Sequence, residues 1–262
     1  MAAWLLRGLR EGVVTTRYPR RPDDYGESFR AAVSVVPSAA SPSDARLADL
    51  CPTGAISVET DRVLLDRGRC IVCGRCVTAA PDRFRFESGP EVASARRAAL
   101  VVPKAGEEGV EFDGLREGLR TQVKAFRRSV HVRHVDAGSD GSEEWEVSAL
   151  LSPVYDVQRL GIYFTASPRH ADILLVTGAG SIGMLDPLRT TYDAMPDPKV
   201  VVAAGTDATS GGLVHPSYAT AGGVAAAVPV DVWVPGSPPS PFSLLQGLIL
   251  AMQVLSGEAV GR

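Results

Sequence analysis

The pattern of apolar and polar positions changes at about residue 129. Before this point the apolar residues form short runs, and the runs at 55–58 and 63–65 flank a polar turn at 60–62. That arrangement predicts a small β-hairpin, and an apolar run at 99–102 predicts one more strand. Farther on, 113–128 has an apolar residue at every third or fourth position and basic residues in its C-terminal half, which predicts a helix.

After residue 129, apolar runs alternate with longer mixed segments, as in strands that alternate with helices. The runs at 173–176 and 200–204 are continuously apolar, which is typical of parallel strands covered on both faces. Asp186–Pro187 predicts the start of one helix, and the last helix is expected at 243–255. We expect a doubly wound, flavodoxin-like α/β domain with a parallel sheet. In such sheets the functional crevice lies beyond the carboxyl ends of the strands, where four loops should gather: 138–143, 178–181, 205–212 and 235–239.

Composition narrows the function classes. The 262 residues are 45% hydrophobic and 22% charged, with a net charge of −3, which argues against nucleic-acid binding. No apolar run is long enough to span a membrane, so membrane attachment would come through partner subunits or a surface helix. Residues 1–25 hold five arginines and few acids. They are interpreted as an arm on a partner subunit or on an anionic membrane surface, or as a solvated tail; we favour the partner.

All four cysteines lie between residues 51 and 76, as Cys51-Pro52 and the triplet Cys70, Cys73 and Cys76. Two-cluster ferredoxins repeat C-x2-C-x2-C-x3-C-P, and the last cysteine of each run ligates the other run's cluster. The triplet and the Cys-Pro therefore belong to one [4Fe-4S] cluster, which predicts an α+β ferredoxin-like domain. A structural zinc site is the alternative, but zinc usually takes two separated C-x2-C pairs. Disulfides are disfavoured because nothing indicates export.

Several motifs after residue 129 give the chain a family resemblance. It resembles the small electron-transfer subunit of membrane-bound [NiFe] hydrogenases such as formate hydrogenlyase, a family that includes the 20 kDa, B-type subunit of respiratory complex I. The N-terminal part, with residues 12–19, resembles the two-cluster ferredoxin subunit of the same complexes, so the chain looks like a fusion of two neighbouring subunits. The motifs occur in the family's order at 135–139, 151–156, 167–178, 195–199 and 235–239.

The resemblance implies a second, proximal [4Fe-4S] cluster held by four cysteines. The matching positions are Asp140, Glu143, Asp207 and Ser237, and none of them is a thiol. Oxygen ligands replace soft thiolates poorly around a cubane, so we expect this site to be empty. Three carboxylates in one cleft could instead bind Mg²⁺ or Ca²⁺. We favour solvated polar replacements, because the loops were shaped for a cubane.

A glycine motif offers a different function. Gly178, Gly180 and Gly183 fit G-x-G-x-x-G after a predicted strand, and Asp207 follows the next strand, as in dinucleotide-binding folds. That mechanism needs a helix that starts within the glycine loop. The predicted start at Asp186 comes several residues late, so this interpretation is disfavoured.

Together these observations predict an electron carrier within an assembly rather than a stand-alone catalyst. We expect one [4Fe-4S] cluster, a large catalytic subunit as partner, and a peripheral position on the cytoplasmic face of the membrane through partner subunits. The alternatives are a redox-inactive interaction subunit and a nucleotide-dependent oxidoreductase. The expected domains are an arm and connector at 1–45, the ferredoxin-like domain at 46–95, a linker with a helix at 96–128, and the α/β domain at 129–262.

Overall fold

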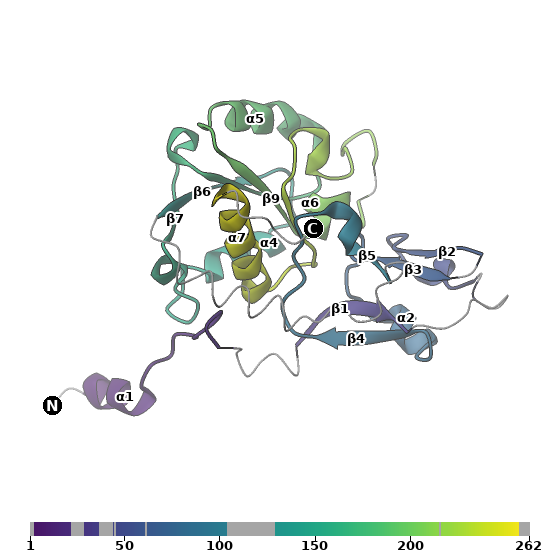
Figure 1. The fold of residues 1–262 in the computed structure, drawn as a ribbon, viewed down its shortest axis with the longest axis horizontal. Helices are drawn as coiled ribbons and strands as arrows, with labels where there is room; N and C mark the ends of the chain where they lie inside the picture. The colour runs from purple at the N-terminus through teal and green to yellow at the C-terminus, as the bar shows by residue number, and fades with distance from the viewer. Residues whose placement is uncertain are drawn as a thin grey trace.

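The structure is a computed structural model that describes residues 3–21, 29–36, 44, 46–60, 62–103, 129–214 and 216–256. The helix predicted at 113–128 lies outside these residues. The described chain forms a larger α/β domain, a smaller β-rich module beside it, and an N-terminal arm (Figure 1). None of the helices within these ranges combines the length and the apolar composition needed to cross a bilayer.

The α/β domain is built on a five-stranded sheet in the order β10-β9-β8-β6-β7. Every neighbouring pair in it is parallel. Read in chain order this is the 2-1-3-4-5 arrangement of flavodoxin-like folds, so the predicted doubly wound sheet is confirmed. Both central strands are buried along their whole length, as their apolar runs predicted. The strands are β6 (Val130–Asp136), β7 (Ile162–Phe164), β8 (Ile173–Thr177), β9 (Val200–Ala204) and β10 (Val232–Val234).

Helices cover both faces of this sheet (Figure 1). On one face, α4 (Ser142–Ala149) and α7 (Pro241–Ser256) pack against alternate strand residues such as Val132 and Val202. On the other face, α5 (Ile182–Asp193) and α6 (Thr206–Ser210) pack against Leu174 and Val201. Because α7 is apolar around most of its circumference and almost fully buried, it forms the centre of the larger core.

The start of α5 corrects one prediction. The helix begins at Ile182, a full turn before the expected Asp186, and it contains Pro187. The Ser181 amide donates to the Ala137 carbonyl at 2.8 Å, and the Ile182 amide donates to the Ala219 carbonyl at 2.8 Å. These contacts from distant segments fix the first turn, and they outweigh the local cost of a proline within the helix.

The smaller module contains the predicted hairpin. Strands β2 (Ile56–Val58) and β3 (Val63–Asp66) pair antiparallel with Ile56 opposite Leu65, and β5 (Val101–Val102) joins β3. The strand predicted at 99–102 is shorter than expected, because 97–100 form a 3-10 turn. A second pair was not predicted: β1 (Arg30–Val35) lies antiparallel to β4 (Phe84–Ser88). Residues 30–35 fall in the segment expected to be arm and connector, yet Val33 and Val35 belong to this module's core.

Polar contacts from the connecting segment hold the module to the α/β domain. Arg97 forms a two-pronged ion pair with Asp66, with N–O distances of 2.8 and 2.6 Å. Ser94 exchanges two backbone hydrogen bonds with Trp233 of β10, at 2.9 and 2.8 Å. The Ala93 amide donates to Gln246 of α7 at 2.8 Å. The position of the module relative to the sheet is therefore defined by direct bonds.

Candidate metal centre and the adjoining cleft

The four cysteines line one pocket of the smaller module. Cys51 follows the 3-10 turn Ala48–Leu50, Cys70 follows β3, and Cys76 lies in the short helix α2 (Arg75–Ala79). Cys70 and Cys76 are buried, whereas Cys73 is exposed. The rest of the lining is largely apolar and includes Val33, Leu50, Pro52, Ile56 and Leu65.

The backbone between the cysteines is held in an unusual conformation. Val72 has φ 53°, which is a left-handed conformation that β-branched residues rarely adopt. The Val72 amide donates to the Cys70 sulfur at 3.4 Å. Gly74 has φ 75°, and a Cβ at this position would lie 2.8 Å from the Phe86 ring. Only glycine satisfies both conditions here. Such strain is typical of segments that aim several side chains at one ligand.

The pKa values of the buried cysteines show that their thiols need a nearby positive charge to ionise. Burial raises the pKa of Cys70 to about 12, and burial also raises the pKa of Cys76. Without positive charge nearby, these groups stay protonated at neutral pH. The Cys51 sulfur accepts a hydrogen bond from the Ala55 amide at 3.2 Å. An iron–sulfur cluster supplies the missing charge, and N–H···S bonds of this kind adjust its reduction potential.

Among the described residues, no group of three or more His, Cys, Asp or Glu side chains converges closely enough to hold a metal ion. A [4Fe-4S] cluster takes one cysteine thiolate at each of its four irons. The pocket, lined by four cysteines and by largely apolar side chains, offers that set of ligands.

The structure brings three of the four degenerate positions together beyond the carboxyl ends of the strands. Glu143 in α4 is only 1% exposed. Its Oε1 atom lies close to Gly205, the residue after β9, where an added Cβ would be 2.6 Å from it. Asp140 and Asp207 are close enough to influence the ionisation of Glu143. Ser237 is exposed in the loop after β10.

We call the carboxyl groups of Asp140, Glu143 and Asp207 the carboxylate cleft, after the crevice expected at this edge of the sheet, and two of the three favour a bound proton. Burial, followed by the charges of Asp207 and Asp140, raises the pKa of Glu143 to about 7. Burial and the charge of Asp140 also raise the pKa of Asp207. The pKa of Asp140 is lowered instead, because it accepts hydrogen bonds from the hydroxyl and amide of Ser142 at 2.6 and 2.9 Å. Two of the three carboxyl groups are thus biased toward their neutral forms.

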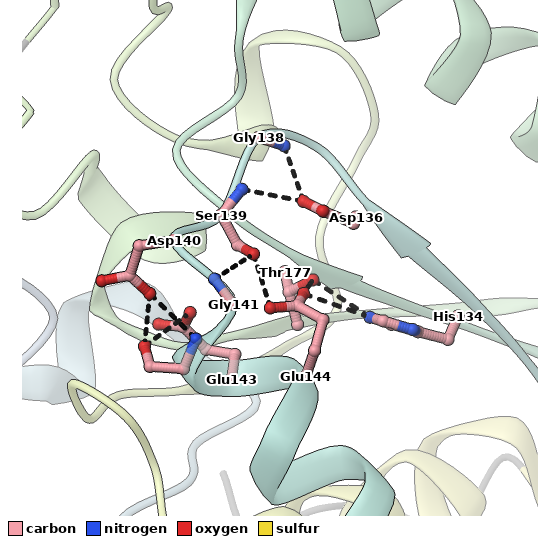
Figure 2. A network of polar contacts seen from close by, with 10 residues as sticks. His134, Asp136, Gly138, Ser139, Asp140, Gly141, Glu143, Glu144 and Thr177 are labelled. Carbon is pink, nitrogen blue, oxygen red and sulfur yellow. Dashed lines mark hydrogen bonds and ion pairs between the residues drawn. The ribbon is translucent and has the colours of Figure 1, made fainter.

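A second polar network begins at the neighbouring residue Glu144 (Figure 2). One carboxylate oxygen of Glu144 accepts a hydrogen bond from Thr177 of β8, and the other accepts one from Ser139 at 2.5 Å. Thr177 also contacts the His134 ring at 3.0 Å. Burial lowers the pKa of His134, so the ring is neutral at pH 7. This network, which ties β6, β8 and α4 together, had no recognisable signal in the sequence.

The glycine loop at 178–183 differs from its prediction. Because α5 begins at Ile182, the objection that the helix starts too late for a dinucleotide-binding loop is wrong. However, the amides of Ser181 and Ile182 already donate to the carbonyls of Ala137 and Ala219. They are not free to bind a pyrophosphate, which is the contact that the motif would have to supply.

Thr206 connects the cysteine pocket with the cleft. Its buried hydroxyl donates to the Cys70 carbonyl at 3.1 Å and accepts the Gly236 amide at 3.2 Å. The residue begins α6, next to Asp207. No sequence pattern distinguished this threonine, because its partners lie far away in the chain.

Replacing Thr206 with valine should therefore destabilise the contact between the smaller module and the α/β domain. The isosteric change leaves a buried amide and a buried carbonyl without partners, which costs about 1–3 kcal/mol. Chemical denaturation of the anaerobic protein measures the loss. The matched control Thr206→Ser keeps the hydroxyl and should retain most of the stability. Equal stability of Thr206→Val and the parent protein would show that the hydroxyl does not hold the parts together.

Two protein-family models match separate parts of the chain. Residues 141–251 match the family model "NADH ubiquinone oxidoreductase, 20 Kd subunit", and residues 63–112 match "4Fe-4S single cluster domain". Formate hydrogenlyase subunit 7 of Escherichia coli is 43% identical over 140 residues, which are 53% of this chain and 55% of that protein. The chain thus spans about half the length of this relative.

Two further relatives match a comparable share of the chain. The B-type subunit of the NADH-quinone oxidoreductase of Desulfovibrio desulfuricans is 46% identical over 43% of this chain and 61% of that protein. The "Probable membrane-bound hydrogenase subunit mbhJ" of Pyrococcus furiosus is 42% identical over 54% of this chain and 85% of that protein. With most of such a relative covered at this identity, the chain belongs to the family of the 20 kDa subunit of NADH ubiquinone oxidoreductase.

Proposed function

We propose that the chain is an iron–sulfur electron-transfer subunit of a membrane-associated complex of the hydrogenase or NADH:quinone oxidoreductase type. Its single [4Fe-4S] cluster would be held by Cys51, Cys70, Cys73 and Cys76. The observation that carries this proposal is that all four cysteines of the chain line one largely apolar pocket. The match to a single-cluster domain and the names of the relatives support it.

Bound in this pocket, the cluster would accept and release one electron at a time. The protein side chains set the conditions for that chemistry. Leu50, Ile56 and Leu65 keep water from the buried thiolates, which makes added negative charge more costly. The amides of Ala55 and Val72 offset part of that cost by donating to sulfur. Exposed Cys73 lies on the side from which a redox partner can approach.

In this proposal the carboxylate cleft holds no cluster. A cubane needs thiolates, and the cleft offers Asp140, Glu143 and Asp207 with Ser237 turned to solvent. Electrons would therefore enter and leave through the cysteine pocket without a second cluster in the α/β domain.

An apolar surface on the α/β domain suits the docking of a large subunit. Two segments that meet near the carboxyl ends of the strands carry exposed apolar side chains, and the bond from Ile182 to Ala219 joins them. Exposed apolar groups that gather in this way usually mark an interface. We place the large subunit on this surface and the complex on the cytoplasmic face of the membrane. The side chains are Ile182, Leu213, Val214 and Tyr218.

A redox titration tests the function. Anaerobically purified protein should give an electron paramagnetic resonance signal on reduction with dithionite, and the signal should disappear on reoxidation and return on a second reduction. A cluster that is present but cannot be reduced would favour the alternative, a redox-inactive interaction subunit. Zinc in place of iron, at about one ion per chain, would favour the structural zinc site and overturn the proposal.

A further inference from the structure

Helix α1 (Ala3–Glu11) has no buried residue. It projects from the body of the molecule at the end of the N-terminal arm (Figure 1). At 100° per residue, its charged residues fall on one side and its large apolar residues on the other. The charged side holds Arg7, Arg10 and Glu11, and the apolar side holds Trp4, Leu5, Leu6 and Leu9.

The arm is anchored to the α/β domain directly after this helix. The Thr16 amide donates to the Val154 carbonyl at 2.8 Å, and the Thr15 hydroxyl donates to the Pro153 carbonyl at 2.8 Å. Tyr18 is buried in the core and stacks edge-on against Phe242 at 5.5 Å. The anchor therefore fixes where α1 leaves the protein.

Further exposed apolar side chains lie next to α1, where the arm contacts the α/β domain. Val13 and Val14 follow the helix and are exposed, and so are Leu151 and Val154 on the loop that the arm contacts. We call these eight side chains the arm surface: Trp4, Leu5, Leu6, Leu9, Val13, Val14, Leu151 and Val154. A surface of this kind usually marks a binding site, because many large apolar groups would otherwise be exposed to water.

The net charge of the arm indicates what binds the arm surface. Residues 3–21 hold five arginines and one glutamate, a net charge of +4, whereas the whole chain has a net charge of −3. The remainder therefore carries −7, the difference between −3 and +4. A negative body is repelled by an anionic bilayer, and a basic arm is attracted to it. Arginines on one face of a helix, with tryptophan and leucine on the other, are typical of helices that lie in the membrane interface.

We propose that the arm surface binds directly to a bilayer that contains anionic lipids, with α1 lying in the plane of the interface. This changes our sequence-based preference for a partner subunit as the ligand of the arm. It adds a direct lipid contact to the proposed attachment through partner subunits, and it does not depend on the cluster. The redox titration and the membrane experiment can thus fail independently.

The test is co-sedimentation of the full chain with lipid vesicles. Binding is expected to vesicles of phosphatidylcholine mixed with an equal amount of phosphatidylglycerol, and little binding to phosphatidylcholine alone. Raising the ionic strength from about 0.05 M to about 0.5 M should release the chain, because salt screens the arginines. The double change Arg7→Glu and Arg10→Glu should weaken binding by about tenfold or more.

Two exposed tryptophans provide a variant and a matched control for testing the apolar side of α1. Trp4 in α1 is 73% exposed and Trp145 in α4 is 79% exposed. Trp4→Ser should weaken binding by about tenfold, whereas Trp145→Ser should leave it unchanged. The Trp4 variant should keep the parent unfolding midpoint, since α1 buries no residue. Absence of binding to the anionic vesicles at low salt, or equal losses for both variants, would overturn the proposal and return the arm to a protein partner.

Discussion

Replacing both Cys70 and Cys73 with serine should remove the iron from the protein. The parent chain, purified without oxygen, is expected to contain about four irons, the content of one cubane. Of these two proposed ligands, Cys70 is buried in the segment that follows β3, and Cys73 is exposed. With two of four thiolates gone, the pocket cannot hold the cluster, so the iron content and the visible absorption of the cluster should both disappear.

A change in the carboxylate cleft provides the control. Asp207→Asn alters the cleft but none of the four proposed ligands, and it should leave the iron content at about four per chain. Iron that persists at this level in the double cysteine variant would show that it is bound elsewhere. About eight irons in the parent chain would mean that the cleft holds a second cluster despite its lack of thiols.

Replacing Glu143 with glutamine should stabilise the protein at alkaline pH. Burial raises the pKa of this group from 4.5 to about 7 in the folded chain, so the native state holds more protons than the unfolded state between these values. Stability therefore falls as the pH rises through this window, and the full penalty is present above about pH 7. A shift of this size corresponds to about 3 kcal/mol.

The quantity to measure is the difference in unfolding free energy between Glu143→Gln and the parent chain, from pH 4 to pH 8 by chemical denaturation. The difference should increase with pH in favour of glutamine and level off above about pH 7. Asp186→Asn removes a carboxyl group at an exposed site beside Arg189, and it is the matched control for the loss of a buried one. A pH-independent difference for Glu143→Gln would show that its carboxyl group is not perturbed by burial.

The sequence predicted the elements whose signals are local. Apolar runs located β8 and β9 because these strands are buried on both faces, and the turn at 60–62 located the hairpin. The spacing of the cysteines predicted which residues share a pocket. The gathering of Asp140, Glu143 and Asp207 followed from the rule that the ends of parallel strands lie at one edge of the sheet.

Features that depend on distant partners could not be predicted in this way. β1 became a strand because it pairs with β4, whose residues follow their partners by 49 to 58 positions in the chain. α5 begins at Ile182 because carbonyls of Ala137 and Ala219 accept its first amides, whereas the local sequence favoured Asp186. The local sequence does not distinguish Thr206, because its hydroxyl donates to the Cys70 carbonyl only in the folded chain.

The bare side chains at Ile182, Leu213, Val214 and Tyr218 have a practical consequence for anyone who prepares this protein. Without the large subunit proposed to cover them, these side chains should associate between molecules in concentrated solution, so recombinant protein produced alone should aggregate. Co-production with the proposed large subunit should keep the protein monodisperse.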